Sequence, residues 1–336
     1  MIMKVTNMAH KYSKILVTGG AGFIGSNLVD RLLSEGFEVT VIDNLDTGRL
    51  ENIAHHQDRE DFHFVKGDIR DFQLVKEIMK DKDAVFHEAA LASVILSVEN
   101  PILTNEINVS GTLNLLKASV DNRVKRFIFA SSAAIYGETP SPQKREDVIS
   151  TPTNPYGVSK LAAENYVKVF HKVYGLETVS LRYFNVYGPR QSFDIQSAYG
   201  GVITIFTNRL LRKLPPIIYG DGEQTRDFVY VEDVVQANIL ALKNKNCVGE
   251  VFNVGTGTTV SVNQVANTLK EILKRNDLRS IYADPQPGDV RHGYADISKA
   301  KKILGYDPKF LFKEGLIKLV NWYSKKTSLT NAPSEL

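Results

Sequence analysis

Short apolar runs alternate with helix-like segments over the first half of the chain. The runs are rich in Val, Ile, Leu and Phe, and they cover residues 14–18, 38–42, 62–65, 83–87 and 126–130. Between them, apolar residues recur at helical spacing, as in 23–33, 72–80 and 107–120. Alternation of buried strands with helices is typical of the α/β class. We therefore predict a doubly wound parallel (Rossmann) sheet, which binds ligands at the carboxyl ends of its strands.

This alternation ends near residue 187, beyond which glycine, proline and helix-forming stretches are mixed. One further strand is predicted at 251–254, a helix begins after Ser261, and a final helix runs through Trp322. The pattern predicts a second, smaller domain of mixed α/β structure. We assign residues 14–186 and about 230–259 to the sheet domain, about 187–229 and 260–330 to the smaller domain, and 1–13 to an N-terminal extension.

A glycine-rich loop, Gly19-Gly-Ala-Gly22-Phe-Ile-Gly25, follows the first strand and opens the first helix. Glycines let the backbone approach a pyrophosphate, and the helix N-terminus favours its negative charge. Asp43 ends the second strand, where a carboxylate accepts hydrogen bonds from ribose hydroxyls and repels a 2′-phosphate. This context favours NAD binding over an ordinary glycine turn. The predicted contacts here are Gly19, Gly22, Phe23, Ile24, Gly25, Asp43 and Asn44.

Further cofactor contacts are predicted where the third and fourth strands end. Asp68 and Ile69 follow the third strand, and Asp68 is placed to bond the adenine amino group, although it would also suit the N-cap of the next helix. Ala89 and Ala90 follow the fourth strand, where small side chains let a cofactor come close.

Tyr156 and Lys160 are four residues apart and therefore lie on one face of a predicted helix. A nearby ammonium and the positive nicotinamide ring favour the phenolate of such a tyrosine over the phenol. Ser132, at the end of the fifth strand, would complete a proton path to a substrate hydroxyl. A Tyr-Lys pair alone also fits an ordinary surface helix, but following an NAD-binding loop it indicates catalysis.

Composition and charge exclude several classes of protein. The net charge is only +3 and the lysines are spread along the chain, so neither nucleic acid nor a membrane surface is predicted as a partner. No apolar run is long enough for a signal peptide or a membrane span, and a cytoplasmic location is expected. Cys247 is the only cysteine and has no disulfide partner within the chain. Because His55-His56 lies in a polar segment without metal-type spacing, we expect a solvated loop and no metal.

Taken together, these motifs resemble the extended short-chain dehydrogenase/reductase family, and within it the nucleotide-sugar C4-epimerases. The resemblance spans nearly the whole chain and is closest to UDP-N-acetylglucosamine 4-epimerases of the bacterial type. Besides the glycine loop and Asp43, it is carried by Gly67-Asp68, Asn108, Ser132, Tyr156 with Lys160, Tyr183-Phe-Asn185, Arg226 and Gly288-Asp-Val-Arg291. It adds Asn108 and Tyr183 to the expected NAD contacts.

The family resemblance implies a mechanism. Tyr156, as a phenolate supported by Lys160, takes the proton of the sugar 4-hydroxyl, to which Ser132 is hydrogen-bonded. Hydride passes from C4 to NAD and leaves a 4-ketose. The 4-ketose then rotates in the site, and the hydride returns to its opposite face. NAD is thereby regenerated in each cycle, and the product is inverted at C4.

The resemblance also implies the substrate contacts of a UDP-sugar. Asn185 and Arg226 match diphosphate contacts and Arg291 is an additional one, because a guanidinium offers planar paired donors. Gly293 stands where narrower epimerases carry a bulky tyrosine, which predicts room for an N-acetyl group. Gln286 replaces an arginine that is common in related chains and would lose one phosphate contact. The remaining predicted contacts are Ile217 and Tyr219, which flank the uracil, Asp289, on the ribose, and Val202.

Three alternatives remain open. Sister enzymes that eliminate water or carbon dioxide need an acid beside Ser132, where this chain has Ala133 and Ala134. A UDP-glucuronate 4-epimerase would need a cation for the carboxylate, which Arg190, Arg291 or His292 would supply. A non-catalytic NAD-binding regulator is disfavoured by the intact Tyr-Lys pair. The family further suggests a homodimer through helices around 105–120 and 155–173.

Overall fold

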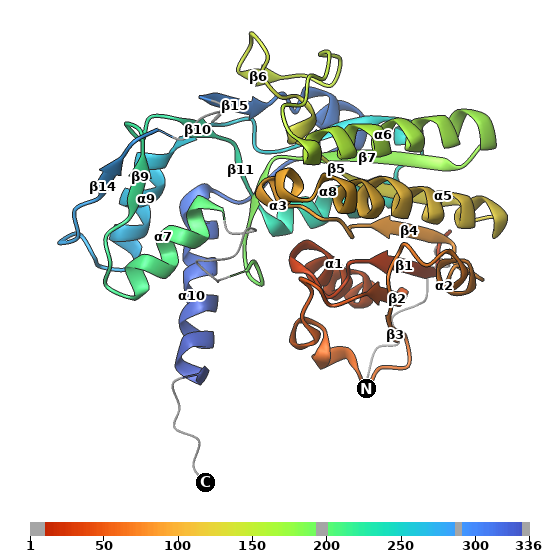
Figure 1. Cartoon of the computed structure of the whole chain (residues 1–336). Coiled ribbons are helices and arrows are strands. Elements are labelled where there is room, and N and C mark those ends of the chain that lie inside the picture. The colour runs from red at the N-terminus through yellow and green to blue at the C-terminus, as the bar shows by residue number, and fades with distance from the viewer. Residues whose placement is uncertain (1–10, 193–200, 286–290, 331–336) are drawn as a thin grey trace.

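A seven-stranded parallel sheet forms the centre of the larger part of the molecule in the computed structural model (Figure 1). The structure describes residues 11–192, 201–285 and 291–330. The strand order is β12-β7-β5-β4-β1-β2-β3, so the chain reverses its direction of winding between β1 and β4. The strands are β1 (Lys14–Thr18), β2 (Glu38–Asp43), β3 (Phe62–Lys66), β4 (Ala84–His87), β5 (Arg126–Ser132), β7 (Glu177–Tyr183) and β12 (Val251–Val254). The predicted doubly wound fold is confirmed.

Helices cover both faces of this sheet because its strands are apolar on both sides. Ile15 and Val17 of β1 lie in one buried cluster, whereas Leu16 lies in the other, as the two-residue period of a strand requires. The first cluster contains residues of α1 (Phe23–Ser34) and α8 (Val231–Lys243). The second contains residues of α2 (Phe72–Ile78), α5 (Gly111–Asp121) and α6 (Pro155–Tyr174).

The helix predicted at 107–120 is part of a longer helical stretch. It is preceded by α3 (Val94–Glu99) and α4 (Pro101–Asn105) and enters α5 through a π-helical turn at Glu106–Ser110. A π-turn is uncommon and often marks a functional position. Here it carries Asn108, one of the predicted cofactor residues.

The smaller part of the molecule lies beside the sheet and has its own buried core (Figure 1). A four-stranded sheet runs in the order β13-β10-β15-β6, and two strand pairs, β8 with β11 and β9 with β14, complete it. The helices are α7 (Val202–Leu211), α9 (Val262–Ile272) and α10 (Phe312–Thr330). The short strands are β6 (Gln143–Lys144), β8 (Asn185–Tyr187), β9 (Ile217–Tyr219), β10 (Thr225–Arg226), β11 (Phe228–Tyr230), β13 (Val260–Ser261), β14 (Ile281–Ala283) and β15 (His292–Ala295).

The two parts exchange segments more than the sequence suggested. Strand β6 comes from the region assigned to the sheet domain but pairs with β15 of the smaller part. Conversely, Ile297 and Tyr306 are buried in the core of the large sheet. The domain boundaries given above therefore stay a prediction. Of the N-terminal extension, Tyr12 is buried and its hydroxyl donates to Glu177.

Two further expectations concern membranes and the cysteine. Within the described ranges, no helix combines the length and apolarity needed to cross a bilayer.

Cys247 is buried and forms no disulfide, and its thiol lies 3.0 Å from the Asn244 carbonyl oxygen. It therefore packs as a small core residue.

Candidate active site

The glycine loop between β1 and α1 is shaped for a close approach of a ligand to its backbone. Gly19 has φ of +68°, and a Cβ atom there would lie 2.8 Å from the Ala89 backbone. A Cβ on Gly25 would lie only 2.2 Å from the Gly19 carbonyl oxygen, so only glycine lets α1 start this near β1. The first turn of a helix presents N–H groups without intrahelical partners. The loop therefore fits a dinucleotide pyrophosphate, and Phe23 and Ile24, which line the adjoining cavity, begin this helix.

Asp43 ends β2 beside this loop and is buried. Its carboxylate accepts hydrogen bonds from the Ala21 N–H, at 3.0 Å, and from the Leu45 N–H, at 2.8 Å. Burial raises the pKa of Asp43, and the two N–H groups oppose the rise. A Cβ on Gly48 would lie 2.6 Å from the carboxylate, so a glycine keeps this side open. Asp43 is thus held at the carboxyl edge of the sheet, where an adenosine ribose would bind.

Asp68 lies on the same edge and forms a polar cluster. It accepts from Asn44 at 3.1 Å and from Arg70 at 2.8 Å, and the Arg70 bonds lower the pKa of Asp68 to about 2. The alternative that Asp68 caps the next helix is wrong, because Asp71 is the N-cap of α2 and accepts from Gln73 and Leu74. Ile69 is buried under Gly111 of α5.

Asn108 anchors the segment that follows β4. Its amide accepts from the Leu91 N–H at 2.8 Å and donates to the Leu91 carbonyl and to Ser159 Oγ. The π-turn therefore fixes the Ala89-Ala90-Leu91 stretch against α6. In this structure Asn108 acts on the cofactor region through the backbone it holds.

Ser132, Tyr156 and Lys160 meet at the carboxyl ends of β5 and β4. Asn154 caps α6 by accepting from the Gly157 N–H, which places Tyr156 and Lys160 in the first two turns. A Cβ on Gly157 would lie 2.7 Å from the Ala134 carbonyl, so this glycine lets α6 come close to Ser132. The Lys160 ammonium donates to the Ala130 carbonyl at 2.8 Å.

The two titratable groups of this set are perturbed by burial. Burial lowers the pKa of Lys160 to about 8, and the charge of Glu88 opposes the shift. Burial raises the pKa of the Tyr156 phenol, and its hydrogen bond with Ser132 opposes the rise. Tyr156 would therefore need a further positive charge nearby to ionise at neutral pH, which the oxidised nicotinamide ring of NAD carries.

Glu88 is a site residue that sequence reasoning missed. It follows β4 and accepts a hydrogen bond from the Tyr183 hydroxyl at 2.8 Å, while Asn238 donates to that hydroxyl at 2.7 Å. Burial raises the pKa of Glu88 to about 7, and the bond from Tyr183 and the charge of Lys160 oppose the rise. A polar residue directly after a buried strand was the available signal.

An ion pair fixes α6 against the sheet. Glu164 of α6 is fully buried and accepts from Arg182 of β7 at 2.7 and 3.0 Å and from Ser131 of β5 at 2.7 Å. Arg182 also donates to the Tyr136 hydroxyl at 2.8 Å. A buried pair with all these bonds holds Tyr156 and Lys160 at a fixed height over the strand ends.

One cavity of about 550 Å³ connects this set to the smaller part of the molecule. Its walls include Ser132, Tyr156, Lys160 and Glu88 at one end and Tyr219 and Arg226 at the other. Among the predicted substrate contacts, Asn185, Val202 and Ile217 also line it. Sequence segments separated by more than a third of the chain, such as those of Glu88 and Arg226, thus form one site.

The other predicted substrate contacts lie outside these walls or outside the described residues. Arg291 is paired with Asp221 at 2.6 Å on the surface of a neighbouring cavity. Gly293 lies in β15 directly beside Arg226 of β10. Asp289 and Gln286 fall outside the described residues.

Comparison with known proteins agrees with this geometry. Residues 16–319 match the family model described as GDP-mannose 4,6 dehydratase. The UDP-glucose 4-epimerase of Thermotoga maritima, solved with UDP-glucose, is 44% identical, with a TM-score of 0.87 over 94% of this chain and 99% of that one. A UDP-N-acetylglucosamine 4-epimerase from Methanobrevibacter ruminantium, solved with UDP-N-acetylmuramic acid, is 40% identical, with a TM-score of 0.89 over 94% and 100%.

A third similar structure contains the cofactor. The UDP-glucose 4-epimerase of Thermus thermophilus, solved with NAD, is 39% identical and covers 93% of this chain and 99% of its own, with a TM-score of 0.82. Together with the glycine loop, Asp43 and the Tyr-Lys pair, these matches show that the chain belongs to the extended short-chain dehydrogenase/reductase family, in its branch of NAD-dependent nucleotide-sugar epimerases and dehydratases.

Proposed function

We propose that this protein, an NAD-dependent nucleotide-sugar 4-epimerase, interconverts the gluco and galacto forms of UDP-N-acetylhexosamines as well as those of UDP-hexoses. The observation that supports this most strongly is the single cavity that joins Ser132, Tyr156 and Lys160 to Tyr219 and Arg226. A nucleotide held at the second group would place its sugar at the first.

In this proposal each residue of the catalytic set has one task. Tyr156 accepts the proton of the sugar 4-hydroxyl and later returns it, and Lys160 keeps the phenolate stable by its charge. Ser132 orients the same hydroxyl. The bound NAD accepts a hydride from the sugar and gives it back.

Epimerisation is favoured over elimination by the residues after Ser132. A dehydratase or decarboxylase needs an additional acid at this point, whereas Ala133 and Ala134 carry methyl groups that cannot transfer a proton. Without such an acid, the 4-keto intermediate does not undergo elimination and is reduced again. Release of its nucleotide is opposed by Arg226, which suits a diphosphate.

Acceptance of an N-acetyl group rests on Gly293. Among the described residues, a Cβ atom there would meet only the Lys144 Cε, at 3.8 Å, so none of them fills the space beside Gly293. The relative from Methanobrevibacter ruminantium, crystallised with an N-acetylated UDP-sugar, supports this choice of substrate.

UDP-glucuronate is the second candidate substrate. It is disfavoured by the positions of the three residues that were predicted to bind its carboxylate. Arg190 is paired with Asp30 at 2.7 Å, Arg291 with Asp221, and His292 lies 3.0 Å from Thr225 Oγ1. Among the described residues, none of the three lines the cavity. A uronate carboxylate in the cavity would therefore not meet any of these three cations as they are placed in the structure.

We also propose a homodimer, for which α6 gives partial support. Val158, Tyr166 and Val169 of α6 are exposed, as are Ile95 and Ile102 of α3 and α4. Apolar groups exposed on neighbouring helices suit an interface between two copies. By contrast, Leu115 and Leu116 of α5, in the other predicted interface region around residues 105–120, are buried within the subunit. Light scattering after size exclusion would give the mass, and a monomer would contradict this proposal.

To test the substrate, purified protein is incubated without added NAD with UDP-N-acetylglucosamine, UDP-glucose or UDP-glucuronate, and the products are resolved by anomeric-proton NMR. We expect galacto isomers of the first two without net NADH. Gly293→Tyr should abolish conversion of the N-acetylated sugar and spare UDP-glucose, while Gly293→Ala serves as the matched control and should keep both. Equal loss on both sugars, or conversion of UDP-glucuronate alone, would contradict the assignment.

A further inference from the structure

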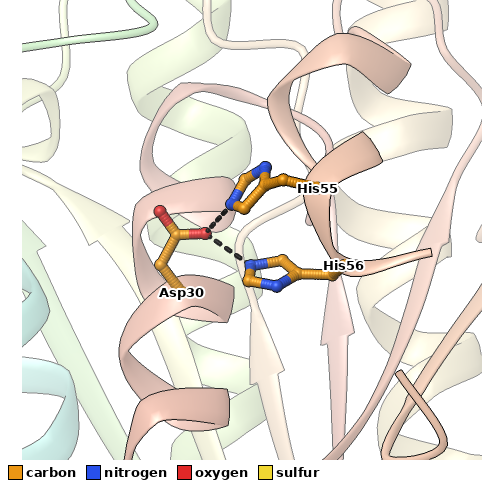
Figure 2. Close-up of side chains that lie close together, drawn as sticks. All are labelled: Asp30, His55 and His56. Carbon is orange, nitrogen blue, oxygen red and sulfur yellow. Dashed lines mark hydrogen bonds and ion pairs between the residues drawn. The ribbon is translucent and has the colours of Figure 1, made fainter. Parts of the chain in front are cut away.

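Asp30 of α1 forms a cluster with His55 and His56, which lie in the connection between β2 and β3 (Figure 2). His56 Nε2 lies 2.7 Å and His55 Nε2 lies 3.0 Å from the same oxygen, Oδ1 of Asp30. We propose that this cluster binds one divalent transition-metal ion of the zinc type. The site is separate from the proposed epimerase function and contains none of its residues.

The convergence of the two histidines is the first argument. They are consecutive in a 3₁₀-helical turn, Ala54–His56, where neighbouring side chains point about 120° apart. Nevertheless, both rings turn towards Asp30, as Figure 2 shows. Their centroids are only 3.9 Å apart. The backbone alone would separate the rings, so a shared partner must draw them together.

The separations of the three donor atoms suit a metal ion. Zinc binds imidazole nitrogen and carboxylate oxygen at about 2.0–2.2 Å, so ligand atoms around a tetrahedral ion lie about 3.4 Å apart. In this cluster the three atoms lie within 4.8 Å of one another, and the two Nε2–Oδ1 distances, 2.7 and 3.0 Å, would have to lengthen by less than about 1 Å to reach that spacing. Small side-chain rotations would therefore admit an ion, and a water molecule would complete the tetrahedron.

Arg190 supports the carboxylate rather than competing for the position of the ion. Its guanidinium donates to Asp30 Oδ2 at 2.7 Å and leaves Oδ1 facing the imidazoles. Metal-binding carboxylates are commonly held in this way by a group outside the ligand shell. Arg190 and Asp30 offset each other in charge, so the ion would bind mainly through the two imidazole nitrogens and one carboxylate oxygen.

The two rings differ in their exposure to solvent. His56 is buried, whereas the His55 side chain is half exposed. The expectation of a solvated histidine pair is therefore wrong for His56, whose ring packs against Phe62. The sequence could not indicate this site, because Asp30 lies 25 positions before His55.

An ion here would join three segments that are distant in sequence. Asp30 belongs to α1, the histidines to the connection between β2 and β3, and Arg190 to the loop after β8. The adjacent Gln191 lines the proposed substrate cavity. The ion would therefore act as a structural link and stabilise the folded state.

The experiment uses the NAD-containing protein without a histidine tag, after treatment with a chelator and its removal. Zn²⁺ is titrated by calorimetry, and Co²⁺ is added in parallel to record the visible absorption of a four-coordinate site. We expect one equivalent to bind and to raise the melting temperature. His55→Ala and Asp30→Asn should each weaken Zn²⁺ binding at least tenfold. Because the His55 side chain is half exposed, His55→Ala should fold like the wild type.

His63→Ala is the matched control. His63 is an exposed histidine of β3 that lies 4.0 Å from Glu38, and no third ligand is grouped with it in the described part of the chain. This variant should bind one equivalent of Zn²⁺ with unchanged affinity. No saturable binding by the wild type, or equal binding by the wild type and His55→Ala, would overturn the proposal and leave a hydrogen-bonded cluster only.

Discussion

Replacing Lys160 by methionine should make the protein more stable while it removes activity. The ammonium is buried beneath the cavity, and burial lowers its pKa to about 8 from the ordinary value of 10.5. At about 1.4 kcal/mol per pKa unit, this difference means that the buried charge lowers the free energy of unfolding by about 3 kcal/mol at neutral pH. Methionine carries no charge and has a similar shape.

One favourable contact is lost in the same substitution. Lys160 donates to the Ala130 carbonyl at 2.8 Å, and loss of a hydrogen bond of this kind costs about 1 kcal/mol. Its ammonium also lies 5.1 Å from the centre of the Phe129 ring, a position that a methionine sulfur tolerates well. We therefore expect Lys160→Met to raise the free energy of unfolding by about 2 kcal/mol at pH 7.

The gain should depend on pH in a defined direction. The folded-state pKa of Lys160 is depressed, so the unfolded chain binds more protons between pH 8 and pH 10.5. The wild type therefore gains stability as the pH rises through this window, and the advantage of Lys160→Met should disappear by its upper end.

Urea unfolding followed by circular dichroism at pH 7 and pH 10 measures both effects. NAD is first removed from each protein, because a ligand of the folded state would add its own stabilisation. Lys172→Met, on the exposed face of the same helix, is the control and should change stability by less than about 0.5 kcal/mol. Epimerisation should fall about 10²- to 10⁴-fold in Lys160→Met and stay unchanged in the control. A variant less stable than the wild type at pH 7, or an advantage that does not change with pH, would refute the reasoning.

Three further predictions concern neighbouring groups. Tyr156→Phe should keep NAD and the fold but lower kcat about 10²- to 10⁴-fold, and unchanged turnover would remove its assigned role. Gly25→Ala places a Cβ 2.2 Å from the Gly19 carbonyl oxygen, so the purified variant should lose bound NAD, measured by absorbance after denaturation; full retention would show that the loop adapts. Glu88→Gln removes a charge that raises the pKa of Lys160, so the alkaline loss of kcat should move to lower pH, and a profile that does not move would contradict this coupling.

The sequence by itself determined the features that depend on local periodicity. The apolar runs and the 3.6-residue patterns indicated six of the seven strands of the large sheet and several of its helices, because burial of strands on both faces leaves continuous apolar runs. The glycine loop and the Tyr156-Lys160 spacing were equally readable, since one short segment contains all the atoms involved. Even there, the capping residue of α2 was Asp71 and not Asp68, because residues this close in sequence compete for one position.

Only the tertiary structure decided which side chains meet across the fold. Glu88 and Tyr183 are 95 positions apart, and they touch because β4 and β7 lie on either side of β5 in the same sheet. Asp30 and His55 meet because α1 packs beside the connection from β2 to β3. Strand β6 joins the smaller sheet although its neighbours in sequence belong to the larger one. Such contacts depend on strand order and on the packing of helices, and no pattern within a short segment encodes either.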